Sequence, residues 1–182
     1  MMMTNILSVR EFELSDLEPF ISYWLNASAS HLAAMGVEIK NLPAKEEFIT
    51  YWTSQLNMPI EERQSYCVIW EKNGIAVGHS STRPTVFGKE AYMHLHLWND
   101  EDRRKGLGSE FVRQTLPFFF ENLQIKDLYC EPFALNEAPN RTMQKVGFEF
   151  VKEYTTTPGP FNFSQNVQLW HLSRKQFIQL SK

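Results

Sequence analysis

The stretch from Ala91 to Asn122 constrains the fold more than any other part of the sequence. Residues 91–98 alternate between apolar side chains and aromatic or histidine side chains, which predicts a strand. A polar turn begins at Asn99, and from Leu107 onward apolar side chains recur at helical spacing. The stretch therefore predicts a strand, a charged turn with two glycines and a helix in direct succession.

This charged turn is typical of an anion site at the start of a helix. The first backbone N–H groups of a helix have no partner inside it, and the helix dipole adds partial positive charge there. Gly106 and Gly108 would let a phosphate approach the backbone closely. The dinucleotide fingerprint fails, because Phe111 stands where its third glycine would be, and no P-loop sequence occurs. The residues expected to surround a bound pyrophosphate are Arg103, Arg104, Lys105, Gly106, Leu107, Gly108 and Ser109.

Two motifs in this sequence resemble those of the GNAT superfamily of acetyl-CoA-dependent N-acetyltransferases. The pyrophosphate loop of that superfamily reads Gln/Arg-x-x-Gly-x-Gly/Ala between a strand and a helix, and Arg103, Gly106 and Gly108 match it. A second signature is an Asn followed eleven residues later by Gly-Phe, which Asn136 and Gly147-Phe148 match. The resemblance covers nearly the whole chain.

Within the superfamily, the branch that includes ribosomal-protein N-acetyltransferases is the most similar. Its pattern, Asn-x-x-Ser-x-Arg-x-x-x-Lys-x-Gly-Phe, is matched at Arg141 and Lys145 but has Pro139 in place of Ser. Met143 stands where many members of the superfamily place a Tyr that is thought to protonate the leaving thiolate. That departure keeps open a CoA-binding module without catalysis.

The resemblance implies a fold class and a cofactor site. The expected fold is an α/β single-domain GNAT fold over residues 1–182, with a mixed, mostly antiparallel sheet, a central parallel pair and helices on both faces. Acetyl-CoA is the implied co-substrate, and Asn136 would hold its pantetheine arm where the two parallel strands splay apart. A backbone N–H near Leu97 or Trp98 would stabilise the developing oxyanion. Arg141 either contacts the cofactor or belongs to a solvated helix face.

Acetyl transfer to an amine needs a proton acceptor, because amines are largely protonated near neutral pH. His94 and His96 lie two apart on one predicted strand and so share a face just before the glycine turn. We rank His96 first, with a hydrogen-bonded structural pair as the alternative role for both histidines. Glu131, at the end of the next predicted strand, is a further candidate base, or else a solvated strand end. No metal site is expected, because no third ligand is evident.

The expected activity is transfer of an acetyl group from acetyl-CoA to a primary amine by direct attack in a ternary complex. The acceptor is a small-molecule or peptide amine, and an aminoglycoside or polyamine is the alternative within the class. Acidic residues at Glu38, Glu46 and Glu47, near the expected acceptor wall, favour a cationic amine.

Composition excludes several other classes of protein. A formal net charge of −3 gives no broad basic field, so nucleic-acid binding is not expected. Neither a signal peptide nor an apolar run of membrane-spanning length is evident, which favours a cytoplasmic protein without a membrane partner. Cys67 and Cys130 fall within predicted strands and are expected to be buried free thiols. The chain is expected to be a monomer or homodimer.

Local signals predict several further elements. Asn73-Gly74 predicts a tight hairpin between strands 65–71 and 75–81, which leads into an antiparallel meander. Residues 127–132 are expected to form a strand parallel to strand 91–98. Ser15, with Glu18, predicts a capping box, and Pro117 predicts a kink near Arg113. Residues 26–42 are expected to be irregular, and their apolar side chains either form a wall of the acceptor pocket or only cover the sheet.

Overall fold

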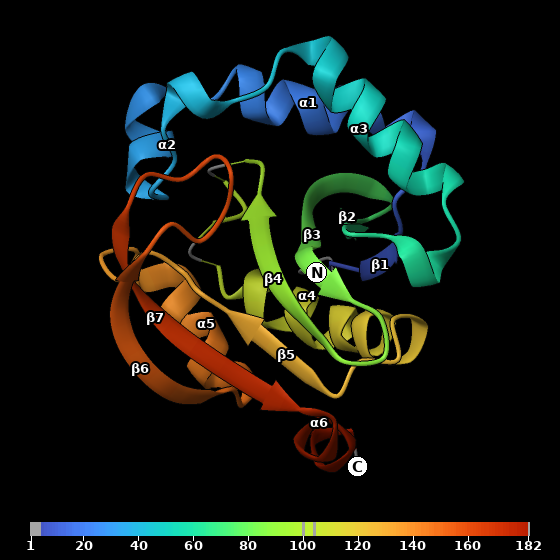
Figure 1. Ribbon diagram of the computed structural model, residues 1–182, viewed down its shortest axis with the longest axis vertical. Coiled ribbons are helices and arrows are strands. Elements are labelled where there is room, and N and C mark those ends of the chain that lie inside the picture. The colour runs from blue at the N-terminus through green and yellow to red at the C-terminus, as the bar shows by residue number, and fades with distance from the viewer. Residues whose placement is uncertain (1–4, 100, 104, 182) are drawn as a thin grey trace.

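A computed structural model describes residues 5–99, 101–103 and 105–181, and its centre is one seven-stranded sheet in the order β1-β2-β3-β4-β5-β7-β6 (Figure 1). The strands are β1 (Leu7–Glu11), β2 (Tyr66–Lys72), β3 (Ile75–Val86), β4 (Glu90–Leu97), β5 (Asp127–Cys130), β6 (Glu149–Thr156) and β7 (Gln165–Ser173). The helices are α1 (Leu17–Leu25), α2 (Ala29–Ala34), α3 (Lys45–Asn57), α4 (Leu107–Pro117), α5 (Glu137–Val146) and α6 (Arg174–Leu180). Shorter turns of helix are η1 (Leu14–Asp16), η2 (Ile39–Asn41), η3 (Ile60–Glu62) and the π-helical η4 (Phe118–Asn122).

The sheet is antiparallel except for β4 and β5, which pair in parallel. This confirms the expected mixed sheet with a central parallel pair, and it confirms the meander of β2, β3 and β4. The hairpin between β2 and β3 is also confirmed, because Asn73 and Gly74 adopt φ values of 54° and 76°. Positive φ at both central residues is what a two-residue hairpin turn requires.

Helices cover both faces of the sheet, as expected. In Figure 1, α1, α2 and α3 lie across one side of the sheet, and α4 lies behind it. The side chains of β2 divide between the two layers, because successive residues of a strand point to opposite faces. Val68 and Trp70 belong to the core under α4 and α5, whereas Cys67 and Ile69 belong to the core under α1 and α3. Cys67 and Cys130 are buried free thiols, as predicted.

Several helix boundaries differ from the predictions. Ser15 does not cap α1; Asp16 accepts the Glu13 N–H at 2.9 Å and pairs with Arg10 at 2.7 Å. The break caused by Pro117 lies at the switch from α4 to the π-helix η4, and so falls after Arg113. Residues 26–42 were expected to be irregular, but they contain α2 and η2. Within the described ranges no helix is both long and apolar enough to cross a membrane.

One buried hydrogen bond fixes α4 to the sheet. The indole Nε1 of Trp70 donates to Thr115 Oγ1 at 2.8 Å, and Thr115 donates in turn to the carbonyl of Phe111 at 2.8 Å. The rings of Trp70 and Phe111 stack with centroids 5.0 Å apart. Because these residues are almost fully buried, water cannot replace a lost partner.

We therefore expect Thr115→Val to lower the free energy of unfolding by about 1–3 kcal/mol, because it leaves the Trp70 indole N–H unsatisfied. Urea unfolding followed by circular dichroism measures this loss. Thr155→Val, on the exposed face of β6, is the matched control and should change stability by less than about 0.5 kcal/mol. Equal effects of the two substitutions would contradict the role given to the Trp70 bond.

Candidate active site

The site begins where the parallel ladder between β4 and β5 ends. Pairing runs from Glu90 and Asp127 to Met93 and Cys130 and does not continue to the end of β4. Beyond it the two strands diverge, as their arrows show in Figure 1. Phe133, just past β5, instead forms an isolated bridge with Val167 of β7. The last residues of β4 therefore have no strand partner on their β5 side.

This divergence exposes particular backbone groups of β4. The Trp98 N–H donates to the Val77 carbonyl at 2.8 Å, so it belongs to the β3 side. Antiparallel pairing alternates the direction of backbone groups residue by residue, which directs the Leu97 N–H toward the gap. The Leu97 carbonyl already accepts a hydrogen bond, because Arg103 Nε donates to it at 3.1 Å. Of the two expected oxyanion donors, only Leu97 has its N–H on the open side.

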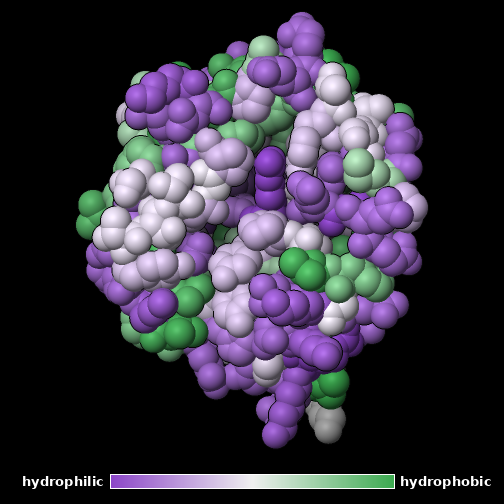
Figure 2. Space-filling view, viewed as in Figure 1, coloured by the Kyte–Doolittle hydropathy of each residue, from purple (hydrophilic) through white to green (hydrophobic). Residues whose placement is uncertain are grey.

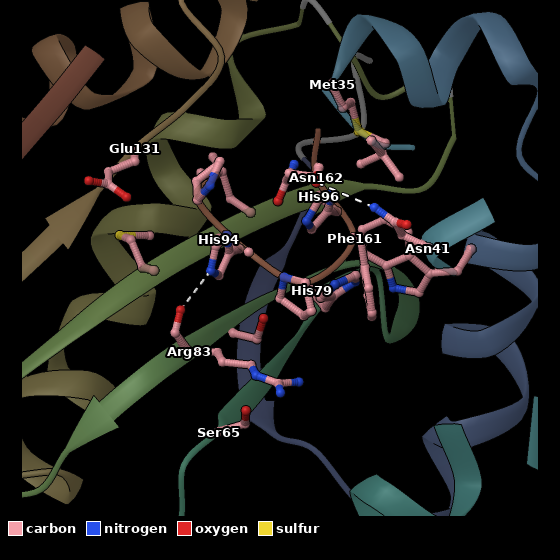
Figure 3. Close-up of a pocket in the computed structure, with 18 of the residues that line it drawn as sticks. Met35, Asn41, Ser65, His79, Arg83, His94, His96, Glu131, Phe161 and Asn162 are labelled. Atoms are coloured by element: carbon pink, nitrogen blue, oxygen red, sulfur yellow. Dashed lines mark hydrogen bonds between the residues drawn. The ribbon is translucent and has the colours of Figure 1, made fainter. Parts of the chain in front are cut away.

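A cavity of about 410 Å³ lies between the sheet and the helices α1 and α3. His94, His96, Glu131 and Asn136, all singled out from the sequence, line it together. Figure 3 shows His79, His94 and His96 close together, with Glu131 on one side and Asn41 and Phe161 on the other. In the space-filling view, a hollow between the helical part and the sheet opens on a face of mixed polarity (Figure 2).

His96 lies between Tyr23 and His79 in this histidine group. Its Nδ1 lies 3.2 Å from the Tyr23 hydroxyl, and its ring stacks on that of His79 with centroids 4.8 Å apart. The described part of the chain offers no hydrogen bond to its Nε2. Burial, followed by the nearby His79, holds the pKa of His96 well below its usual value of 6.5. His96 is therefore neutral at pH 7.

His94 is held by the backbone of the neighbouring strand. Its Nε2 lies 2.9 Å from the carbonyl oxygen of Arg83, which can only accept, so Nε2 carries the proton. Burial is the main cause that lowers the pKa of His94. A neutral His94 consequently presents the lone pair of Nδ1.

Three residues that the sequence did not single out complete this cluster. His79 pairs across β3 and β4 with His96, and burial lowers its pKa to about 3. Its Nδ1 accepts from the Trp98 indole at 2.8 Å. The Tyr23 hydroxyl lies 3.2 Å from both His31 Nε2 and His96 Nδ1, and burial raises its pKa. Of these three residues, only His79 could have been placed from the sequence, because the predicted meander sets its register against His96.

Glu131 lies on the other side of the cavity and accepts a short hydrogen bond from the Tyr154 hydroxyl. Burial and this carboxylate both raise the pKa of Tyr154. Among the described residues, no three His, Cys, Asp or Glu side chains converge as metal ligands do.

The glycine turn lies at the start of α4, whose first residue is Leu107. Gly106 caps the helix with φ of 75°, a conformation that favours glycine. A Cβ on Gly108 would meet its nearest atom, Thr142 Oγ1, at 3.6 Å, so it would fit in ordinary van der Waals contact. Lys105 is exposed and Ser109 is buried, whereas Arg104 lies outside the described residues.

The turn is anchored from two directions. Asp102 is buried and pairs with Lys72 of β2 at 2.6 Å. Arg103 lies across the end of β4, because its guanidinium donates to the carbonyls of Leu97 and Trp98 and contacts His31. These contacts fix the turn relative to the histidine cluster.

Helix α5 forms the other border of the turn. Asn136 is its N-cap residue and lines the cavity. Arg141 pairs with Glu137 at 2.6 Å on an exposed face. The α5 atoms nearest to Gly108 and Gly106 belong instead to Thr142 and Lys145.

Comparison with known proteins gives matches across most of the chain. The family model described as "Acetyltransferase (GNAT) domain" matches residues 7–149. The aminoglycoside N(6')-acetyltransferase type 1 of Klebsiella pneumoniae is 27% identical over 140 residues, which is 75% of this chain and 67% of that protein.

Two solved structures share the fold over nearly their full length. The spermidine N-acetyltransferase of Vibrio cholerae, in complex with CoA and spermine, gives a TM-score of 0.75 at 15% identity and covers 94% of this chain and 98% of its own. RimL, a ribosomal L7/L12 α-N-protein acetyltransferase in complex with CoA, gives a TM-score of 0.74 at 12% identity. The match covers 93% of this chain and 95% of RimL.

The family match spans both predicted motifs up to Gly147-Phe148 and the splayed strands between them. The chain therefore belongs to the GNAT acetyltransferases, as an enzyme that transfers an acetyl group from acetyl-CoA to an amine.

Proposed function

We propose that this enzyme acetylates the primary amine of a small molecule. The observation that carries the proposal is the single cavity that joins the acceptor wall to the open edge of β4. The segment Pro158–Asn162 lines the cavity opposite the sheet. It is joined to the segment before η2, because the Glu38 N–H donates to the Phe161 carbonyl at 2.8 Å. This enclosure favours a compact acceptor over a folded protein terminus.

Several residues of the chain fit acetyl-CoA, which supplies the acetyl group as a thioester. The backbone amides at the start of α4, from Gly106 to Ser109, fit the pyrophosphate, and Lys105 adds positive charge. Lys145 lies near enough to add a second cation, whereas Arg141 is engaged by Glu137. The Leu97 N–H fits the acetyl oxygen, Asn136 lies on the cavity side, and Arg104 remains a predicted phosphate contact.

We infer that His96 accepts the proton of the attacking amine. In this arrangement the Tyr23 hydroxyl donates to His31 Nε2 and accepts from His96 Nδ1–H, which leaves the lone pair of His96 Nε2 facing the cavity. Transfer forms the amide N–C bond and breaks the thioester C–S bond. The proton lost by the amine passes to His96 and ends, through solvent, on the CoA thiol. His94 and Glu131 are the alternative proton acceptors.

Turnover itself tests the proposal against a CoA-binding module without catalysis. Release of free CoA thiol is measured with acetyl-CoA and a panel of primary amines, and the acetylated product is identified by mass spectrometry. Binding of CoA without amine-dependent thiol release would favour the binding module.

We expect Gly108→Val to weaken CoA binding at least tenfold, because its side chain would stand between the phosphates and the start of α4. Valine fits the helical backbone better than glycine, so the melting temperature should not fall. Calorimetric titration with CoA gives the affinity. Gln144→Val, on an exposed position of α5, is the control and should bind CoA normally. Normal binding by folded Gly108→Val would remove the phosphate assignment.

We expect His96→Gln to lower kcat roughly a hundredfold while leaving CoA affinity unchanged, because a general base contributes on this scale. Apart from protonation of the acceptor amine itself, the wild-type kcat should show an acidic limb that lies below pH 6.5, since the lowered pKa keeps His96 neutral to that point. The variant should lose this acidic limb.

The matched control is His171→Gln, which removes a histidine that pairs with Asp127 outside the cavity. It should retain both kcat and the acidic limb. If His96→Gln keeps the limb as well, the proton acceptor is elsewhere, and the same profile measured on His94→Gln and Glu131→Gln identifies which of the two it is.

A further inference from the structure

The cavity wall carries a fixed cation, Arg83, that has no carboxylate partner among the described residues. Its guanidinium lies over the ring of Tyr51, 4.8 Å from the ring centroid. The hydroxyl of Tyr51 is itself held by Ser65 Oγ at 2.6 Å. In Figure 3 the Arg83 side chain extends toward Ser65, away from the backbone carbonyl that binds His94. An ordered guanidinium without an internal anion is suited to an anion on a ligand.

The cavity wall carries charges of both signs. Glu47 and Glu131 are the carboxylates among the lining residues, and Arg83 is the cation. Each carboxylate already accepts a hydrogen bond: Glu47 accepts the Ala44 N–H at 2.7 Å, and Glu131 accepts from Tyr154. Arg83 disfavours a second cationic group of the acceptor beside it, because like charges repel. Glu38 and Glu46, which the sequence placed near the acceptor, do not line the cavity.

The rest of the wall is mainly apolar and aromatic. The aromatic lining residues are Phe20, Trp24, Phe48, Tyr51, Trp52, Phe133 and Phe161. The wall thus favours an acceptor with an apolar or aromatic body.

The backbone of Arg83 lies beside the histidine cluster, because its carbonyl accepts from His94 Nε2 at 2.9 Å. The Arg83 side chain extends from this point along the cavity wall toward Ser65 (Figure 3). One molecule of amino-acid or dipeptide size can therefore place its amine at the histidine cluster and its far end at the guanidinium.

We propose that the acceptor is a monoamine with an aromatic or apolar body and a carboxylate, and that Arg83 binds the carboxylate. This proposal rests on amine acetylation as the function of the cavity. It separates this chain from the polyamine and aminoglycoside substrates named for its relatives. Arg83 acts as a specificity residue, since it binds a part of the acceptor that does not react.

The test compares matched acceptors that differ only in the anion. Phenylalanine and phenylalanyl-phenylalanine are assayed against their C-terminal amides at saturating acetyl-CoA, with thiol release as the readout. We expect kcat/KM to be at least tenfold higher for one of the acids than for its amide, mainly through KM. A charged hydrogen bond of this kind contributes on that scale. In Arg83→Gln the ratio of acid to amide should fall to near one.

Two further variants exclude a structural effect of the substitution. Arg83→Lys keeps the charge and should retain part of the preference. Lys126→Gln removes an exposed cation just before β5, outside the cavity, and should retain all of it. Equal rates for acids and amides in the wild type, or an unchanged ratio in Arg83→Gln, would overturn the proposal.

Spermidine and kanamycin complete the acceptor panel. Acetylation of either without acetylation of the acids would refute the carboxylate assignment and leave amine acetylation intact. Absence of turnover with every amine, despite CoA binding, would refute the proposed function itself.

Discussion

The site depends on one event in the sheet, the end of the parallel β4–β5 ladder at Met93 and Cys130. A strand edge that opens inside a sheet presents backbone groups that need partners, and here these include the Leu97 N–H. The crossover through α4 places the helix N-terminus beside the same opening. Past Cys130 the chain stays beside β7, through the bridge between Phe133 and Val167, and leaves β4. The opening is therefore a property of the backbone pairing, and the side chains around it adapt it to acetyl transfer.

The histidine cluster shows how packing sets the protonation state. His79 and His96 stack on one another within an aromatic layer formed with Tyr23 and Trp24, where a charged imidazole would lose its hydration. A second positive charge nearby, such as Arg103, disfavours protonation further. The result is a neutral His96 over the whole physiological range. A lowered pKa also makes it a weak base, so it suits transient proton relay rather than stable proton storage.

Local sequence signals predicted those features whose causes are local. Asn73-Gly74 gave the hairpin through positive φ, and alternation along β4 brought His94 and His96 to one face. The error at the start of α1 comes from a contact between two elements: Asp16 replaces Ser15 there and pairs with Arg10 on β1. The same distinction between local signals and contacts made by packing holds for the site residues. Glu131 and Asn136 were found through their motifs and strand ends, whereas the roles of Tyr23 and Arg83 depend on partners brought together by packing and register.

The position of β7 has a consequence for how the chain is made. β7 lies between β5 and β6, although almost all of the chain precedes it in synthesis. Gln165, at its start, also donates to the Gly36 carbonyl at 2.8 Å and so closes one wall of the cavity. On the ribosome, the segments proposed to bind CoA are synthesised well before the segment that closes this wall of the cavity. Until Ser173 emerges, β5 remains an open edge on which another nascent strand can pair, so this interval is when the chain most needs chaperone protection.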